Sequence, residues 1–242
     1  KFPNMVILDA EVSNSTYAEK VKDRVPSQFI ECFIEEQTMI GVAQGLAIKG
    51  HRVFASTFAA FLTRAHDQIR MAALSGTSMT ICGSHAGVSV GEDGPAPMGL
   101  EDIALFRALP ESTVLYPADA VAAERLVQLA ASNPGITYIR TTRPKTSLIY
   151  NEKEAFILND FKIIKLSNND SAVLVGAGIT LHESLKAHDI LKKQGVSTTV
   201  IDIYCIKPFP FAKFINIVQK HGNCVVITED HYSEGGIGEM IS

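Results

Sequence analysis

Short runs rich in β-branched residues alternate along this 242-residue chain with longer segments whose apolar residues recur at helical spacing. Residues 5–10 and 52–58 are typical of buried strands, whereas residues 61–76 and 119–135 predict helices that end at a glycine or at Pro-Gly. Strands that alternate with helices form βαβ units, in which helices cover both faces of a parallel sheet. The sequence therefore predicts an α/β fold of doubly wound parallel sheets.

A change in composition divides this pattern into two parts. Residues 144–171 are more polar and carry turn signals, and alternating strands and helices resume after them. We expect a first domain at residues 1–150, a linker at residues 151–170 and a second domain at residues 171–242. We expect the second domain to be incomplete, because residues 238–242 are typical of the first turns of a helix and the sequence ends there.

The composition excludes several classes of protein. Hydrophobic residues make up 46% of the chain, the formal net charge is −4 and tryptophan is absent. Enough apolar material is present for one large core or two modest ones, which excludes a disordered chain. The acidic balance and the few aromatic residues argue against nucleic-acid binding. No apolar stretch is long enough to predict a membrane span, and the first residues lack the pattern of a signal peptide.

The four cysteines indicate a reducing compartment. Cys32, Cys82, Cys205 and Cys224 lie far apart and form neither a Cys-x-x-Cys pair nor a cluster with metal-ligand spacing. We interpret them as buried, reduced thiols, which are typical of cytosolic proteins. We therefore expect a cytoplasmic protein with no metal ligands in this chain.

A glycine-rich turn after one predicted strand is similar to a dinucleotide fingerprint. Gly176 and Gly178 precede a predicted helix, and Asp202 ends a later strand where a ribose-binding acid would stand. The fingerprint needs a third small residue, however, and Leu181 occupies that position. We therefore expect an ordinary tight βα turn here rather than a nucleotide site.

A loop after another predicted strand carries polar residues suited to a ligand. Residues 82–97 are rich in glycine, serine and proline and include His85, Glu92 and Asp93. Loops after the carboxyl ends of parallel strands form the ligand crevice of such sheets, and a histidine titrates near neutral pH. The alternative is a solvated surface loop without a ligand.

Two further segments combine polar or aromatic side chains with apolar surroundings. Glu35 and Glu36 interrupt an apolar stretch, so one carboxyl can be solvated while the other is buried and able to exchange a proton near neutrality. The alternative is a favourable interaction of both acids with a helix N-terminus. Phe58 and Phe61 share a face if their segment is helical, and they either pack in the core or stack on a heterocycle.

Arginines at the end of a predicted strand complete the candidates. Arg140 and Arg143 follow the strand in YIRTTRP. A guanidinium binds phosphate or carboxylate groups through two parallel hydrogen bonds, so an anionic ligand is one interpretation and solvated arginine is the other.

Together these segments resemble one enzyme family, the transketolases. The likeness rests on IECFIEEQ, STFAAFLTRAHDQIRMAA, GSHAGVSVGEDGP, LYPADAVAAE and YIRTTRP, and it continues through GAGITLHESL and EDHYSEGGIGE. It covers essentially the whole chain and corresponds to the pyrimidine-binding domain of the family followed by most of its C-terminal domain. The resemblance implies the transfer of a two-carbon ketol unit from a ketose phosphate to an aldose phosphate, a reaction of the pentose phosphate pathway. It also implies thiamine diphosphate as the cofactor.

The resemblance assigns a role to individual residues. Glu36 matches the glutamate that hydrogen-bonds the aminopyrimidine ring and favours the tautomer that removes the C2 proton of the thiazolium. Phe61 matches the residue that stacks on the pyrimidine, and Phe58 lines the same pocket. His85 and Asp93 match contacts to substrate hydroxyl groups, with His85 also a proton-transfer candidate. The resemblance further assigns the substrate phosphate to Ser15 and Arg143, and a cofactor contact to Glu11.

The resemblance also implies partners outside this chain. In the family the active site lies between two subunits, which predicts a homodimer. An N-terminal domain with a GDG-type motif holds the diphosphate and its Mg²⁺ or Ca²⁺, and these 242 residues contain no such motif. We therefore expect this chain to be active only together with that domain.

Two departures from the family pattern keep alternatives open. Glu11 stands where the family usually has aspartate, and Pro97 replaces a residue that is often polar. A transketolase-like interaction protein without activity is one alternative. Another thiamine enzyme, such as deoxyxylulose phosphate synthase or the β-subunit of a 2-oxo acid dehydrogenase, is the other.

Overall fold

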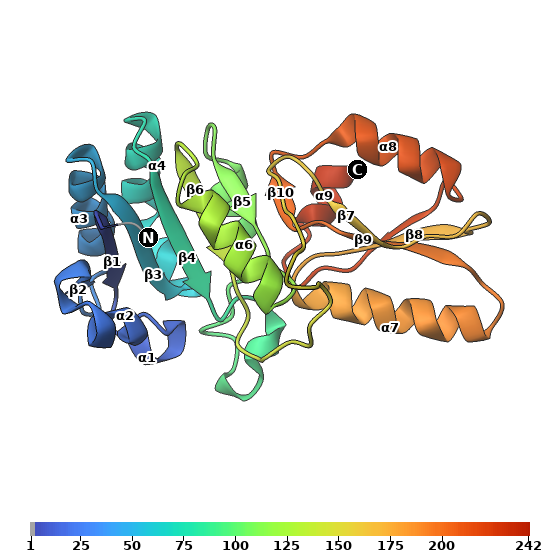
Figure 1. Ribbon diagram of the computed structural model, residues 1–242, viewed down its shortest axis with the longest axis horizontal. Coiled ribbons are helices and arrows are strands. Elements are labelled where there is room, and N and C mark those ends of the chain that lie inside the picture. The colour runs from blue at the N-terminus through green and yellow to red at the C-terminus, as the bar shows by residue number, and fades with distance from the viewer. Residues whose placement is uncertain (1–2) are drawn as a thin grey trace.

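A computed structural model describes residues 3–242 and contains two β-sheets flanked by helices (Figure 1). The first sheet has seven strands in the order β10-β5-β6-β4-β3-β1-β2, and the second has four in the order β11-β8-β9-β7. We refer to residues 3–150 as the N-terminal region and to residues 162–242 as the C-terminal region. The two regions lie side by side along the longest axis of the molecule (Figure 1).

The first sheet is built mainly from the N-terminal region. Its strands are β1 (Met5–Asp9), β2 (Phe29–Glu31), β3 (Arg52–Phe58), β4 (Met79–Ser84), β5 (Thr113–Leu115), β6 (Ile136–Arg140) and β10 (Cys205–Lys207). The helices here are α1 (Ser13–Thr16), α2 (Glu19–Arg24), α3 (Glu36–Ile48), α4 (His66–Leu74), α5 (Asp102–Arg107) and α6 (Ala120–Ala130), with 3₁₀ turns η1 (Pro26–Gln28), η2 (Ala59–Ala65) and η3 (Val88–Asp93).

The second sheet belongs to the C-terminal region. It consists of β7 (Lys162–Lys165), β8 (Ala172–Gly176), β9 (Thr198–Asp202) and β11 (Val225–Ile227), and its helices are α7 (Ile179–Lys193), α8 (Phe211–Lys220) and α9 (Ile237–Ile241). In Figure 1, α7 and α8 lie on opposite sides of this sheet. The predicted α/β class with two doubly wound sheets is therefore confirmed.

Two strands depart from the expected parallel pattern. Strand β10 comes from the C-terminal region but pairs antiparallel with β5, so it extends the first sheet. Strand β7 pairs antiparallel with β9 and lies inside residues 151–170, the segment expected to be a linker. Both strands lie at sheet edges, where an antiparallel strand needs no crossover helix.

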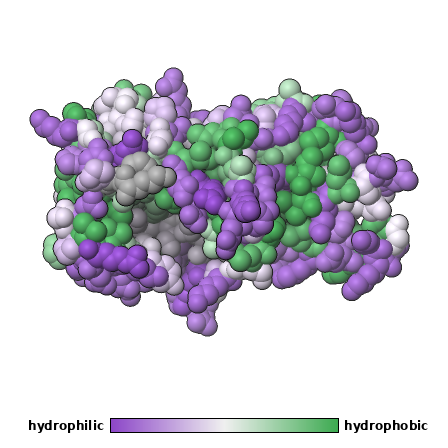
Figure 2. Space-filling view, viewed as in Figure 1, coloured by the Kyte–Doolittle hydropathy of each residue, from purple (hydrophilic) through white to green (hydrophobic). Residues whose placement is uncertain are grey.

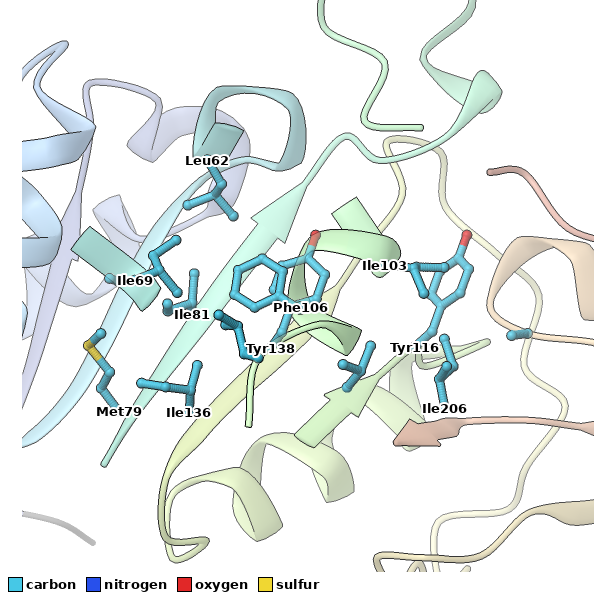
Figure 3. Close-up of a cluster of buried hydrophobic side chains, with 14 of the residues drawn as sticks. Leu62, Ile69, Met79, Ile81, Ile103, Phe106, Tyr116, Ile136, Tyr138 and Ile206 are labelled. Carbon is cyan, nitrogen blue, oxygen red and sulfur yellow. The ribbon is translucent and has the colours of Figure 1, made fainter. Parts of the chain in front are cut away.

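Apolar residues fill the space between the first sheet and its helices. Side chains along one strand alternate between the faces of a sheet, so Tyr138 packs with the α3, α4 and α5 side while Ile139 packs with α6. Figure 3 shows the buried row that runs from Leu62 and Ile69 past Phe106 to Tyr116 and Ile206. Because this cluster continues into buried residues of the second sheet, the two regions share one core.

Hydrophobic and hydrophilic residues are interspersed over the face of the molecule that Figure 2 shows. Hydrophobic patches lie at the upper middle and to the right of centre, and hydrophilic residues cover much of the centre, the two ends and the lower edge. Among residues 3–242 no helix combines the length and apolar character needed to cross a membrane.

Candidate functional site

The carboxyl ends of the parallel strands gather the candidate residues at one edge of the first sheet. Strands β1, β3, β4 and β6 are neighbours and run parallel, so the segments that follow them meet at that edge. The sequence-predicted residues Glu11, Phe61 and His85 follow β1, β3 and β4 within a few positions, and Arg143 follows β6. Two adjoining cavities lie among these segments.

The first cavity contains Glu36 and measures about 380 Å³. Its walls are formed by Ala10, Glu11, Val12, Ile34, Glu36, Phe61 and Arg64. Glu36 is the first residue of α3 and its side chain is 1% exposed, even though its neighbour Glu35 is exposed. The burial of one acid and the solvation of the other agree with the sequence interpretation of this pair.

The two carboxylate oxygens of Glu36 have different surroundings. Oε2 pairs with Nη1 of Arg64 at 3.2 Å, whereas Oε1 is buried and has no hydrogen-bond partner among the described residues. An unpaired buried polar atom is costly, so such an atom commonly indicates a ligand contact or a bound water. Arg64 also lies 5.2 Å from the centroid of the Phe61 ring, which joins the ion pair to the aromatic wall. Arg64 was not among the residues predicted from the sequence, although it stands three positions after Phe61.

Phe58 joins the first cavity to the second. Its ring stacks on Phe61 with centroids 5.2 Å apart and on the His85 imidazole with centroids 4.1 Å apart. Phe58 ends β3 and Phe61 lies in the 3₁₀ turn η2, so the two rings do not share an α-helical face as the sequence analysis considered. They nevertheless come together, because the tight turn brings Phe61 back toward the strand end.

His85 follows β4 in the left-handed backbone conformation, with a φ of 56°. Its Nδ1 and the Ser84 hydroxyl are 2.8 Å apart, and its ring lies against Phe58. Burial lowers the pKa of His85, the positive charge of Arg143 lowers it further, and Asp93 opposes both effects. The imidazole is therefore mostly neutral at pH 7 and able to accept a proton.

The second cavity measures about 440 Å³ and joins residues from three strand ends. It is lined by Asn14, Ser15, Thr16, Tyr17, Ser84, His85, Thr141, Thr142 and Arg143. Ser15 and Arg143 thus share a cavity with His85, while Asp93 pairs with Nη1 of Arg143 at 3.0 Å. The hydroxyl groups and the guanidinium make this cavity suited to a polar, anionic ligand.

A buried carboxyl holds the segment that carries Ser15. Asp9 ends β1 and accepts hydrogen bonds from the backbone N–H of Val12 at 2.8 Å and from the Thr16 hydroxyl. Burial raises the pKa of Asp9 to about 6, against the opposing effect of these hydrogen bonds. Asp9 was not among the sequence candidates, and its place at the end of a strand is the signal that could have identified it.

Arg140 is part of the core rather than of the cavity. Its side chain is fully buried, with Nε 2.8 Å from Asp102 Oδ2 and Nη1 2.7 Å from Asp230 Oδ1. The interpretation that Arg140 binds an anionic ligand is therefore wrong, because two carboxylates of the protein itself occupy its guanidinium. These partners are distant in sequence and could not be seen from the local pattern YIRTTRP.

The glycine turn after β8 leaves no room for a nucleotide. A Cβ at Gly178 would lie 1.9 Å from the Tyr116 ring, so the aromatic side chain already covers this turn. The tight βα turn expected from the sequence therefore packs directly against an aromatic ring. Within residues 3–242, no group of three or more His, Cys, Asp or Glu side chains is arranged to hold a metal ion.

Comparisons with known proteins give consistent matches along the chain. The family model for the pyrimidine binding domain of transketolase matches residues 1–147, and that for the C-terminal domain of transketolase matches residues 162–242. Transketolase-like protein 1 of Bos taurus is 51% identical and transketolase of Homo sapiens is 48% identical, each over 239 residues. These alignments cover 98% of this chain but 40% and 38% of the relatives, so the chain spans about two fifths of their length.

A solved structure described as a split-gene transketolase, an inactive β4 tetramer, has the same fold. It superposes with a TM-score of 0.88 at 31% sequence identity. The superposition covers 99% of this chain and 77% of that chain.

Proposed function

The chain belongs to the transketolase family, and we propose that it supplies the pyrimidine-binding part of a thiamine-diphosphate-dependent ketol transferase. The reaction moves a two-carbon unit from a ketose phosphate to an aldose phosphate. The observation that carries the proposal is Glu36, a buried carboxyl that lines an open cavity with one oxygen lacking a partner in the described part of the chain.

The residues of the first cavity fit the aminopyrimidine ring. Ala10, Val12 and Ile34 provide an apolar wall, and Phe61 provides an aromatic face. Glu36 Oε1 is a buried polar atom of this wall without a partner in the described part of the chain, so it can hydrogen-bond a ring nitrogen while Arg64 occupies Oε2. Glu11 is exposed beside the same cavity and would lie near the edge of the cofactor.

Each residue contributes a separate part of the chemistry. When bound, the cofactor supplies the electron sink for breaking and forming the carbon–carbon bond. Glu36 would share a proton with the pyrimidine ring through Oε1, while Arg64 keeps the carboxyl in one orientation. Phe61 would hold the ring by stacking, and Phe58 supports Phe61 from behind. With the ring in place, the apolar wall would keep water from the Glu36 carboxyl.

The second cavity would hold the sugar phosphate. Ser15 and Arg143 provide a hydroxyl and a guanidinium for the phosphate group, and Asp93 keeps the guanidinium in position. His85, whose pKa is lowered by burial, is suited to accept a proton from a substrate hydroxyl at neutral pH. Because the Phe58 ring contacts both Phe61 and His85, the cofactor in the first cavity and the sugar phosphate in the second would meet at this ring.

Residues outside this chain would complete the site. Phe33 and Ile34 are 64% and 67% exposed beside Glu36, which is unusual for large apolar side chains next to a cavity. We propose that a second subunit of a homodimer covers them, and that segments beyond residues 1–242 hold the diphosphate and its Mg²⁺ or Ca²⁺. The inactive state given for the β4 tetramer of the split-gene relative supports this need for a further part.

A neutral replacement of Glu36 tests the proposal. In the whole protein that contains residues 1–242, Glu36→Gln should lower kcat/KM for ketol transfer from xylulose 5-phosphate to ribose 5-phosphate by about 100-fold or more, because the amide cannot exchange the proton. The matched control is Glu35→Gln, which makes the same change at the exposed neighbour and should leave the rate unchanged. Normal turnover by Glu36→Gln would refute the assigned role.

Two alternatives predict other results. A transketolase-like protein without activity, which the departures at Glu11 and Pro97 allow, would bind no thiamine diphosphate in calorimetric titration with magnesium. A deoxyxylulose phosphate synthase or a 2-oxo acid dehydrogenase subunit would bind the cofactor but form a different product. Product analysis after incubation with pyruvate and aldehyde acceptors separates these enzymes from a transketolase.

A further inference from the structure

A carboxylate of the C-terminal region lies directly under the loop that carries His85. Asp230 follows β11 by three positions and is 6% exposed. Its Oδ1 accepts a hydrogen bond from Nη1 of Arg140 at 2.7 Å, and its backbone carbonyl accepts one from Nη2 of the same guanidinium at 2.9 Å. The Tyr116 hydroxyl donates to Oδ2 at 3.1 Å. These bonds hold Asp230 in one orientation.

The same carboxylate touches the loop at Gly87. A Cβ at Gly87 would lie 1.8 Å from Asp230 Oδ2, and the φ of Gly87 is 78°. A side chain at this position would therefore collide with Asp230, and glycine allows the loop backbone to rest on the carboxylate. Gly87 is two residues from His85, so a shift of Asp230 would also displace the His85 imidazole.

One carbonyl ties the loop to the buried guanidinium. The Gly99 carbonyl accepts a hydrogen bond from Gly87 N–H at 2.9 Å and another from Nη2 of Arg140 at 3.0 Å. The backbone N–H of Ala86, next to His85, donates to the Thr141 carbonyl at 3.0 Å, one residue beyond Arg140. The His85 loop therefore rests on the assembly that Arg140 and Asp230 form.

We propose that Asp230 of the C-terminal region is a positioning residue for His85. Asp230 acts through its contacts with Gly87 and Arg140. Packing of the C-terminal region against the first sheet therefore fixes the position of the His85 imidazole on the Phe58 ring. The inference deepens the proposed function and depends on it for the role of His85 toward substrate. The sheet of the C-terminal region would thereby contribute to the site without supplying a group that touches the reactants.

The test follows the His85 imidazole by NMR in the whole protein labelled at histidine ¹³Cε1. His85→Gln identifies the resonance, and Asp230→Asn removes the charge that holds Arg140 and the loop. We expect the His85 signal to lose the ring-current shift from Phe58. Its pKa should rise by about half a unit or more, because a looser loop lets water reach the imidazole and burial is the main cause of the lowered value.

A matched control removes a buried carboxylate elsewhere in the C-terminal region. Asp170 is buried and accepts hydrogen bonds from Ser167 and Thr199, and its partners all belong to the C-terminal side of the chain. Asp170→Asn should lower stability while leaving the His85 resonance and its titration unchanged. A purely structural role for Asp230 predicts the same result for both variants.

A second variant keeps the experiment decisive if Asp230→Asn does not fold. Asp230→Glu retains the charge beside Arg140 but adds a methylene group against Gly87, so it should also move the His85 resonance. An unchanged resonance in every folded Asp230 variant would overturn the proposal. Where ketol transfer is measurable, kcat/KM should fall about 10-fold in Asp230→Asn. A shifted His85 signal in a protein without ketol transfer would refute the proposed function and leave the positioning role intact.

Discussion

At the scale of single residues, the surroundings of each carboxyl decide what it can do. Glu35 and Glu36 are adjacent and chemically identical, yet one is solvated and the other is buried beside Arg64. Asp9 and Asp202 are buried at the ends of two strands, and burial raises the pKa of both. A buried acid with a raised pKa weakens the fold when it ionises, because the unfolded chain solvates the charge better.

Asp202 provides a test of this effect away from the candidate site. Its Oδ2 accepts a hydrogen bond from the Tyr150 hydroxyl, Oδ1 has no partner within residues 3–242, and burial raises its pKa to about 7. Between the ordinary value and pH 7 the folded state keeps a proton that the unfolded state releases, so this carboxyl lowers stability as the pH rises. Asp202→Asn should therefore raise Tm relative to the wild type, with a difference that grows from pH 5 to pH 8.

The control for Asp202→Asn is a substitution that is expected to lower Tm rather than raise it. Hydrogen bonds from Ser167 and Thr199 and the nearby His221 lower the pKa of Asp170, against the effect of burial. Its ionised form therefore stabilises the fold, and Asp170→Asn should lower Tm at pH 5 and at pH 8. A Tm difference for Asp202→Asn that shrinks as the pH rises would contradict the argument.

At the scale of elements, strand ends and helix starts position the functional segments. Asp119 illustrates this in a second place, because it caps α6 through a 2.8 Å hydrogen bond from Ala122 N–H. Its other oxygen accepts hydrogen bonds from the backbone N–H groups of Ile149 and Tyr150, at 2.7 and 2.9 Å. One side chain therefore begins a helix and holds the chain that leaves the first sheet.

Loss of this cap should be measurable by urea unfolding. Asp119→Ala leaves three backbone N–H groups without their acceptor and should lower the free energy of unfolding by about 2 kcal/mol or more. Asp119→Asn keeps one capping oxygen and should cost less. On the exposed face of the same helix, Glu124→Ala removes a hydrogen bond from Gln128 and an exposed ion pair with Arg125, and it should change stability by less than about 0.5 kcal/mol. Equal losses for Asp119→Ala and Glu124→Ala would rule out the capping role.

At the scale of the whole molecule, a buried ionic cluster joins the two regions. Arg140 lies between Asp102 of the N-terminal region and Asp230 of the C-terminal region, and strand β10 adds a backbone link between the same regions. The Tyr138 hydroxyl also donates to Asp102 at 2.6 Å. We expect the cluster to make the two regions unfold as one cooperative body, because separating them would leave charges without partners.

Removal of the central cation should uncouple the regions. Arg140→Met leaves two carboxylates in the core, and we expect it to lower the free energy of unfolding by about 3–5 kcal/mol. Calorimetry should then resolve two transitions where the wild type has one. Arg70→Met, which removes an exposed ion pair with Asp67, should cost less than about 1 kcal/mol. A single transition of unchanged midpoint in Arg140→Met would show that the cluster does not hold the regions together.

The sequence by itself determined the fold class, most of the strands and helices, and the segments that gather at the site. Local periodicity and turn residues carry that information, because they reflect contacts between near neighbours in the chain. The burial of Glu36 beside Arg64 and the stacking of Phe58 on His85 required the folded chain. So did the role of Arg140, for which the local pattern allowed either an anionic ligand or a solvated side chain. Its partners stand 38 and 90 residues away, and only the packing of two sheets brings them together.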